Sequence, residues 1–360
     1  MRILVLNWKD LAHPKAGGAE VYTSEITERW ASDGHEVTLF CAAVDGQPAD
    51  ELIRGVRIVR RGSRLGVYRA ARLWYAEHGR GRYDVVIDEV NTRPFLTPRW
   101  LTDTPVVALI HQVCREIWSY ETPWPVSVIG RYWLEPRWLR LYRDVPTLTV
   151  SQSSLESLRE YGLRNVQVVP EGVGDLVRPV VSKEERPTVL FVGRLTRSKQ
   201  PLHALEAFRL LQRKLPEARM WFVGAGPERS RLEAAKVEGV SYFGRVTQAE
   251  KHERMARAHV LAATSVREGW GLVVDEAAAM GTLAIAYDVP GLRDSVSTAG
   301  GSLVLPNPLA LAEALFTLLR ADGHSSPRAF LGGARPWREV ANACLEQINR
   351  VLGRPHRSAL

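Results

Sequence analysis

Two carboxylates in one stretch of the chain point most directly to chemistry. They are Glu268 and Glu276, within residues 267–281, which read REGWGLVVDEAAAMG. Glu268 lies in a glycine-flanked loop, and the apolar spacing from Leu272 onward predicts a helix that carries Glu276. On one continuous helix the two carboxylates would be displaced along the axis. We therefore expect the loop to fold back if both side chains bind one ligand.

The glycines of this loop suit the approach of an anion. Gly269 and Gly271 flank Trp270, and glycine adopts backbone angles that other residues avoid. The free amides near Gly271 and Leu272 would point from a helix N-terminus toward a ligand such as a diphosphate. The stretch predicts a clamp in which amides bind phosphates and carboxylates bind hydroxyls. The alternative is two solvated surface acids, which the flanking glycines, the helix and the strand-like segment 283–287 make less attractive.

This stretch also resembles a known motif. Glu268 and Glu276, followed by an Ala-rich helix and Gly281, are similar to the paired glutamates of retaining glycosyltransferases with the GT-B fold, especially family 4. The resemblance implies an α/β protein with two facing Rossmann-like domains, parallel sheets and a cleft between them. It also implies donor-binding roles for the residues of the loop and helix start, which are Gly269, Trp270, Gly271, Leu272 and Glu276.

A pair of cations opens the second half of the chain. VLFVGRLTRSKQP places Arg194 just after a predicted strand and Lys199 five residues later, so both side chains can turn into one loop. Two fixed cations there would neutralise a departing diphosphate. The chain has no D-x-D acid pair for a metal, so we expect neither metal nor cofactor. The resemblance implies that Arg194 and Lys199 bind the donor diphosphate beside Gly193, with the base near Val246; a solvated Arg and Lys is the alternative.

The first half begins with a predicted βαβ unit over residues 3–41. Its helix spans residues 19–33 and opens at Gly17 and Gly18, as a contact with an anion or a sugar would require. The loop is too long for a dinucleotide fingerprint. The family resemblance implies that Gly17, Gly18 and Glu20 lie against the donor diphosphate or the acceptor. A plain helix-entry turn is the alternative.

A single histidine marks the end of a predicted strand in the first half. His111 closes the apolar run PVVALIH at residues 105–111, which places it at the carboxyl end of the strand. The family resemblance implies contact with a hydroxyl of the transferred sugar. A metal-ligand role is not expected, because no second histidine or carboxylate stands at a ligand spacing. Asp88 and Glu89, at the previous strand end, are weaker candidates for acceptor contact.

Length and composition favour two globular domains. The chain has 360 residues, of which 45% are hydrophobic and 24% charged. It has no run of about 18 apolar residues, and its N-terminus reads as a strand, not a signal peptide. Three cysteines without metal or redox spacing favour the cytoplasm. The expected parts are an acceptor domain, a linker, a nucleotide-sugar domain and a helix that crosses back to the first domain, at residues 1–175, 176–187, 188–335 and 336–352.

The net charge of +8 leaves the question of a membrane open. Nucleic-acid binding is not expected, because no recognition motif accompanies the charge. The basic stretch Arg54–Arg72 reads equally well as an edge strand, Val56–Val59, with a solvated helix or as a phosphate or membrane patch. The segment Trp118–Arg143 is dense in aromatics and arginine, and we favour a helix packed beside the cleft over a membrane or lipid-acceptor surface. Peripheral contact with the inner face of the membrane is thus an alternative.

The family resemblance implies a retaining glycosyltransferase, and the two cations together with the lack of a D-x-D pair favour a metal-independent one. It would move a hexosyl group, mannosyl or glucosyl, from a nucleotide-diphosphate sugar to a glycan, lipid-linked or small-molecule acceptor. Arg194, Lys199 and the helix amides would stabilise the diphosphate, Glu268 and His111 would hold the sugar, and Glu276 the ribose. The alternatives are a nucleotide-sugar epimerase or phosphorylase on the same scaffold, or a non-catalytic binding subunit. No protein partner is implied.

Overall fold

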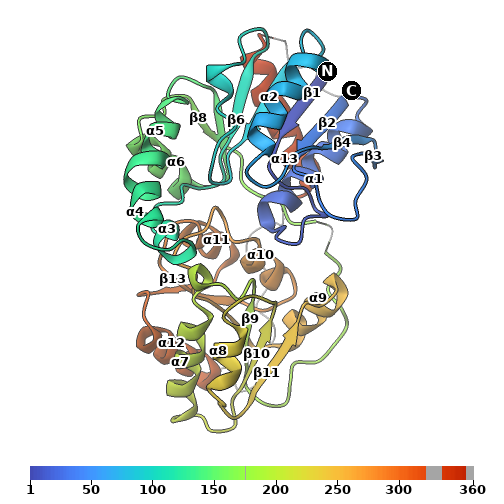
Figure 1. The fold of residues 1–360 in the computed structure, drawn as a ribbon. Helices are drawn as coiled ribbons and strands as arrows, with labels where there is room; N and C mark the ends of the chain where they lie inside the picture. Colours follow the sequence, from blue (N-terminus) through green and yellow to red (C-terminus); the bar gives the residue numbers. More distant parts are fainter. Residues whose placement is uncertain (175, 322–334, 354–360) are drawn as a thin grey trace. The chain divides into compact units, whose positions relative to one another are not determined.

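A computed structural model describes residues 1–174, 176–321 and 335–353, which form two compact units (Figure 1). The first unit comprises Met1–Arg115, Val128–Gly172 and the described residues from Arg335 on. The second comprises Glu116–Ser127 and the described residues between Gly172 and Arg335. The segment Glu116–Ser127 thus belongs to the second unit, although the sequence-based boundaries put it in the first. Residues 175 and 322–334, at the expected domain ends, lie outside the described residues.

The described part of the first unit contains one eight-stranded sheet with the order β3-β4-β2-β1-β5-β6-β7-β8. All neighbours run parallel except β3 and β4. The central strand β1 is buried because parallel sheets are covered on both faces, and Ile3 lies between Val37 and Val85. The strands are β1 (Arg2–Leu6), β2 (Glu36–Cys41), β3 (Asp50–Ile53), β4 (Val56–Arg60), β5 (Val85–Glu89), β6 (Val106–Leu109), β7 (Thr147–Thr149) and β8 (Val166–Val168).

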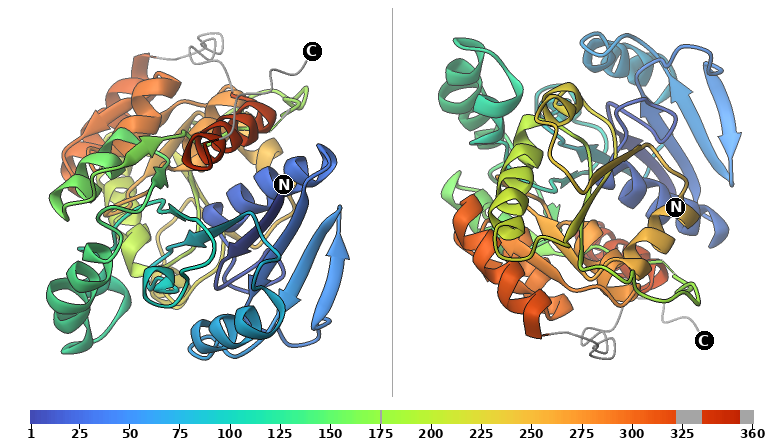
Figure 2. Two further views of the ribbon diagram at one scale, coloured as in Figure 1. Left: turned by 90° about the horizontal axis from the view of Figure 1, so that it is seen from above. Right: turned by 90° about the horizontal axis from the view of Figure 1, so that it is seen from below.

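The helices of the first unit pack around this sheet. Near the end of the chain, α13 (Trp337–Val351) lies beside α1 (Gly18–Ser32), as Figure 2 shows in red and blue. The indole N–H of Trp30 donates to the Ala341 carbonyl (2.9 Å), and the Trp337 ring meets the Tyr22 ring edge-on at 5.6 Å. The others are α2 (Val67–His78), the 3-10 turn Thr97–Arg99, the π-helical turn Gly130–Leu134, α5 (Glu135–Arg140) and α6 (Gln152–Glu160). The short helix α4 (Val126–Ile129) begins in the second unit and ends in the first.

Two predicted details of the first unit are corrected by the structure. The strand at Val56–Val59 is not at the edge of the sheet, because β3 pairs with it in antiparallel register. β6 ends at Leu109, so His111 lies in the following loop and not on the strand itself.

The described part of the second unit contains a six-stranded, all-parallel sheet with the order β11-β10-β9-β12-β13-β14. Its strands are β9 (Thr188–Val192), β10 (Arg219–Val223), β11 (Val240–Gly244), β12 (Val260–Ala263), β13 (Ala284–Tyr287) and β14 (Ser302–Val304). Its helices are α3 (Ile117–Glu121), the 3-10 turn Arg197–Lys199, α7 (Pro201–Gln212), α8 (Arg229–Ala234), α9 (Gln248–Arg257), α10 (Leu272–Ala279), α11 (Leu292–Ala299) and α12 (Pro308–Ala321). The core is one apolar cluster of strand and helix side chains, including Phe191, Phe208 and Phe222.

The expected linker at residues 176–187 is attached to the second unit at its C-terminal end. The Lys183 ammonium donates to the Ala258 carbonyl (2.6 Å), the Gly281 carbonyl (3.0 Å) and the Thr282 hydroxyl (2.6 Å). Burial, together with the charge of Arg178, lowers the pKa of Lys183 to about 8.

None of the described helices combines the length and the apolar character that crossing a membrane requires.

Candidate active site

Most of the predicted donor-site residues lie in loops at one edge of the second sheet. The loops that follow β9, β12 and β13 leave the carboxyl ends of neighbouring parallel strands. Gly193, Arg194 and Lys199 follow β9, and Glu268 follows β12. Ligands of open α/β sheets bind at this edge, so the topology brings together residues that are far apart in the sequence.

Backbone hydrogen bonds connect these loops directly to one another. The Val266 N–H donates to the Ser198 carbonyl (2.9 Å), which ties the loop after β12 to the loop after β9. The Glu268 N–H donates to the Pro290 carbonyl (3.0 Å) and so ties the loop after β12 to the loop after β13. The position of Glu268 is therefore fixed by both neighbouring loops.

Two glycines permit this close packing of loops. A methyl group on Gly291 would collide with the Glu268 carbonyl, and its φ of +83° disfavours other residues. A methyl group on Gly224, with φ +134°, would collide with the Gly193 carbonyl. Glycine at 291 and at 224 thus brings the backbones of the site loops together.

The central side-chain contact of the site joins Lys199 to Glu268. The Lys199 ammonium bonds Glu268 Oε1, and the Ser265 hydroxyl donates to the same oxygen (2.5 Å). Both charged side chains are mostly buried. A cation and a carboxylate from different loops, held side by side, can bind a phosphate and a sugar hydroxyl, respectively.

Glu276 lies on α10 and has a lysine of its own. The Lys251 ammonium, on α9, bonds both carboxylate oxygens of Glu276 at 2.8 Å. The two glutamates of the motif therefore bond different lysines. The helix and the preceding loop are as predicted, and the Trp270 indole N–H donates to Asp275 within them.

The remaining predicted donor residues surround the start of α10 and the loop after β9. Gly271 precedes α10 with φ +102° in the left-handed region, so the chain turns sharply before Leu272. Gly269 and Trp270 are buried, whereas Arg194 is exposed. Val246, after β11, packs partly on the core.

The segment from the first half of the chain that belongs to the second unit contacts these loops. Glu116, just before α3, pairs with the Arg267 guanidinium (2.9 Å). Glu121, on α3, accepts the Ser198 N–H (3.3 Å) and the Ser198 hydroxyl. Arg267 precedes Glu268 and Ser198 precedes Lys199 in the sequence. The contacts of α3 therefore help to hold both site loops in place.

In the first unit His111 lies between two carboxylates. His111 Nδ1 is 3.3 Å from Glu171 Oε1, and Nε2 is 3.6 Å from Glu89 Oε1. The Tyr22 ring covers the imidazole edge-on at 5.0 Å. Burial lowers the pKa of His111, but the hydrogen bond with Glu171 and the charges of Glu171 and Glu89 outweigh it and raise the pKa to about 9. The imidazole is therefore a buried cation at neutral pH.

Gly17 and Gly18 open α1, and a carboxylate of the same helix satisfies the free amide. The Gly17 N–H donates to Glu20 Oε2 (2.6 Å), which also pairs with the Lys9 ammonium at 3.0 Å. Burial raises the pKa of Glu20, while Lys9 opposes the shift. Asn91 donates to Glu20 Oε1 (3.3 Å) and so attaches this cluster to the loop after β5.

Asp88 and Glu89 differ in what surrounds them. Asp88 is fully buried and accepts hydrogen bonds from the Thr97 and Tyr142 hydroxyls and from the Phe95 N–H. These bonds explain Asp88 as a structural carboxylate that fixes the loop after β5. Glu89 instead belongs to the polar group around His111.

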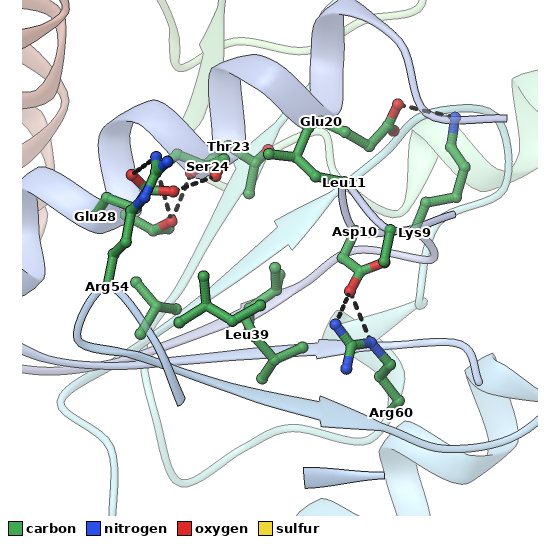
Figure 3. A pocket seen from close by; sticks show the side chains of 15 residues that line it. Lys9, Asp10, Leu11, Glu20, Thr23, Ser24, Glu28, Leu39, Arg54 and Arg60 are labelled. Carbon is green, nitrogen blue, oxygen red and sulfur yellow. Dashed lines mark hydrogen bonds and ion pairs between the residues drawn. The ribbon is translucent and has the colours of Figure 1, made fainter. Parts of the chain in front are cut away.

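A pocket of about 180 Å³ lies under α1 in the first unit (Figure 3). Its floor is formed by branched aliphatic side chains of the strands, and its roof by small hydroxyl side chains of α1. Ion pairs between Arg54 and Glu28 and between Arg60 and Asp10 lie at its two ends, and Glu20 is part of its wall. The floor and roof comprise Leu39, Ile53, Val56, Ile58, Thr23, Ser24 and Thr27.

Within the residues that the structure describes, no group of three or more His, Cys, Asp or Glu side chains could hold a metal ion.

Sequence reasoning missed the residues that hold the predicted carboxylates. Lys251 and Ser265 contact Glu276 and Glu268, but neither was singled out. Ser265 lies three residues from Glu268 in a loop, a spacing that could have suggested the contact. Lys251 is 25 residues from Glu276, so only the packing of α9 on α10 reveals the pair.

Solved structures with the same architecture identify the fold class. Sucrose-phosphate synthase from Thermosynechococcus elongatus superimposes with a TM-score of 0.73 at 21% identity, covering 98% of this chain and 99% of that chain. HepE from Anabaena, solved in complex with UDP and glucose, gives a TM-score of 0.70 at 16% identity, with 97% and 100% covered. The two parallel-sheet units thus have the GT-B fold.

Family models and curated relatives narrow the assignment. Residues 16–175 match the family described as Glycosyltransferase Family 4, and residues 175–330 match Glycosyl transferases group 1. The chain belongs to glycosyltransferase family 4. It is 28% identical to a D-inositol 3-phosphate glycosyltransferase of Xylanimonas cellulosilytica, over 92% of this chain and 91% of the relative. It is 29% identical to a 2-deoxystreptamine glucosyltransferase of Streptomyces kanamyceticus, over 71% and 73%.

Proposed function

We propose that the protein transfers a hexosyl group, mannosyl or glucosyl, from a nucleotide-diphosphate sugar to a hydroxyl acceptor, with retention and without a metal ion. The observation that carries the proposal is the Lys199–Glu268 pair, held where the loops after β9 and β12 meet. Arg194 is exposed in the same loop as Lys199. The UDP and glucose named with HepE support a nucleotide-sugar donor.

Each charged group of the second unit has a proposed role. Lys199 and Arg194 bind the diphosphate, together with the amides at the start of α10. Glu268 accepts hydrogen bonds from sugar hydroxyls, and Glu276 accepts them from the ribose. Because Lys251 bonds both oxygens of Glu276, it would keep that carboxylate oriented while the ribose binds.

In the proposed reaction the bond between the sugar C1 and the β-phosphate oxygen breaks, and its electron pair stays with the phosphate. The acceptor oxygen bonds to C1 on the same face, and its proton goes to the departing phosphate oxygen. Lys199 and Arg194 stabilise the charge that develops on the leaving group. No residue of the chain is assigned as a covalent nucleophile. His111, as a buried cation, would hold a hydroxyl of the transferred sugar if Nε2 turned from Glu89.

The first unit is proposed to bind the acceptor. The pocket under α1 adjoins Glu20 and has an apolar floor, which favours a lipid-linked or small-molecule acceptor over a plain glycan. Aryl and alkyl glycosides should then be better acceptors than the free sugars. Thr27→Ile, which extends into the pocket, should raise the KM for such acceptors and leave donor hydrolysis unchanged.

The donor assignment is tested by incubating the protein with UDP-, GDP- and ADP-sugars in EDTA and measuring the nucleoside diphosphate released. One donor should be hydrolysed slowly, and Arg194→Ala and Glu276→Ala should abolish the release. Lys214→Ala is a matched control, because Lys214 pairs with Glu313 on the exposed surface of the same unit. Release that requires added Mg²⁺ would contradict metal independence, and silence with every donor would favour a non-catalytic binding subunit.

A further inference from the structure

One exposed helical face of the first unit is unusual in its side chains. From Val128 the chain runs through α4, the π-helical turn and α5, and four large apolar side chains on it face solvent. Tyr132 is 62% and Trp133 59% exposed, with Val128 and Ile129 one turn earlier. The opposite side of the same helical segment is buried through Gly130, Glu135 and Leu139. The segment therefore packs on its unit by one side and presents apolar groups to water on the other.

Cations surround these apolar groups, and no exposed acid of the same stretch opposes them. Arg137 and Arg140 are exposed on α5, and the Arg137 guanidinium lies 5.3 Å from the centre of the Trp133 ring. Glu135 is the one acid between residues 128 and 143. Its carboxylate is buried and accepts the Arg115 N–H at 2.9 Å, so it does not neutralise the surface. We call Val128, Ile129, Tyr132, Trp133, Arg137 and Arg140 the basic aromatic face.

We propose that the basic aromatic face docks the protein on the surface of an anionic lipid bilayer. Tryptophan and tyrosine prefer the headgroup region, where the ring is in the apolar boundary and the polar atom remains hydrated. Arginines beside them attract anionic headgroups, and branched aliphatic side chains gain free energy by entering the acyl boundary. All three kinds of side chain occur together here, on one side of one helical segment. The proposal does not depend on the proposed donor or acceptor.

Other occupants fit these observations less well. A stable protein interface buries about 800 Å² on each partner with some 20–30 residues, far more than this face offers. Two copies joined by the same face would bring arginines against arginines. A nucleic acid would satisfy the arginines and rings, but Val128 and Ile129 would gain nothing from its phosphate backbone.

The test is flotation of the full-length protein with vesicles of phosphatidylcholine alone and with vesicles that also contain phosphatidylglycerol. We expect binding to the anionic vesicles, which high salt weakens. Tyr132→Ser/Trp133→Ser should abolish most of it. Arg137→Gln/Arg140→Gln should weaken it by about 25-fold, because each cation near an anionic surface contributes roughly fivefold.

Matched controls lie on α2 of the same unit and in the turn after it, where Leu73, Arg80 and Arg82 are also exposed. Leu73→Ser and Arg80→Gln/Arg82→Gln should change vesicle binding by less than about twofold. Unchanged melting temperatures in all variants would show that the fold is intact. Equal loss in control and face variants would overturn the proposal, as would absence of vesicle binding. The proposal would also be overturned if light scattering showed a wild-type dimer that Tyr132→Ser/Trp133→Ser dissociates. Tight binding of single-stranded DNA that the same variant abolishes would overturn it as well.

Discussion

At the scale of single residues, the candidate donor site consists of charged side chains that form ion pairs with one another. Glu268 and Glu276 each bond a lysine from a neighbouring segment, Lys199 and Lys251. Such pairs are held by packing, so a ligand that brings a diphosphate and hydroxyls meets groups that are already oriented. The same pairs make the charge of each side chain separately testable.

Replacing Lys199 by alanine should lower donor turnover by about 10²–10³-fold. The change removes a cation from the leaving diphosphate and leaves Glu268 without its partner. The measurement is kcat for nucleoside diphosphate release, and Lys214→Ala should retain wild-type kcat. A Lys199→Ala protein with wild-type kcat would show that the lysine only supports the loop.

His111 should make the free energy of unfolding depend on pH. Its pKa is raised from 6.5 to about 9 in the folded protein, so the contribution is fully present below about pH 6.5 and is lost as the pH rises to about 9. The loss amounts to at most about 3.5 kcal/mol, since one pKa unit corresponds to about 1.4 kcal/mol.

The measurement is urea unfolding across this pH range for the wild type and for His111→Gln, which should show a flatter profile. A direct check is NMR titration of the His111 imidazole. Titration near 6.5 would contradict the ion pairs with Glu89 and Glu171.

At the scale of elements, the site depends on loops that touch through glycine. Gly291→Ala should push the Glu268 carbonyl away and strain the backbone at a φ of +83°. We expect a loss of about 1–3 kcal/mol in the free energy of unfolding, together with a lower rate of donor turnover. Both are measurable in one preparation, by thermal unfolding and by diphosphate release.

Gly81→Ala is the control, because its φ is +64° and nothing lies within 4 Å of the added methyl group. It should lose some stability by backbone strain alone and keep full turnover. Equal turnover in Gly291→Ala and Gly81→Ala would indicate that the Glu268 loop does not need its present position.

The sequence predicted most helices and strands, but it missed one edge strand and the unit to which one helix belongs. The alternation of apolar runs with amphipathic helices located both sheets, and the strand-like segment 283–287 contains β13 (Ala284–Tyr287). The edge strand β3 was missed, because Asp50–Ile53 is short and carries two acids, so it lacks a buried strand's pattern. The inclusion of α3 in the second unit was also missed, because it depends on contacts of Glu116 and Glu121 with distant loops.

The sequence predicted those parts of the candidate site whose residues lie close together along the chain. Glu268, Gly271 and Leu272 are consecutive or nearly so, and the turn into α10 follows from the glycine. The partners Lys251 and Glu171 could not be found in this way, because sheet topology and helix packing bring them to Glu276 and His111 from distant positions.

At the scale of the whole molecule, the last described helix, α13, is part of the first unit. Trp337 is buried at the start of α13 against the Tyr22 ring, and a methyl group on Gly172 would lie 2.9 Å from the Trp337 ring. Further along α13, the Cys344 thiol is 3.1 Å from the Tyr22 hydroxyl. The core of the first unit therefore includes side chains of α13.

Trp337→Ala should lower the free energy of unfolding by about 3–5 kcal/mol, the range for loss of a large buried aromatic side chain. Urea unfolding followed by circular dichroism measures the change. Trp124→Ala is the matched control, since Trp124 is 81% exposed and should shift stability by less than about 0.5 kcal/mol. Similar losses in the two variants would contradict the packing of α13.

The donor site in the second unit is the central claim, and calorimetric titration with UDP, GDP and ADP in EDTA tests it most directly. One nucleotide should bind the wild type and Lys214→Ala equally well, and at least tenfold more weakly to Arg194→Ala/Lys199→Ala. The matching nucleoside without phosphates should bind weakly to all of them, because the cations contact the diphosphate. Equal nucleotide binding by all three proteins, or no binding of any nucleotide, would contradict the assignment.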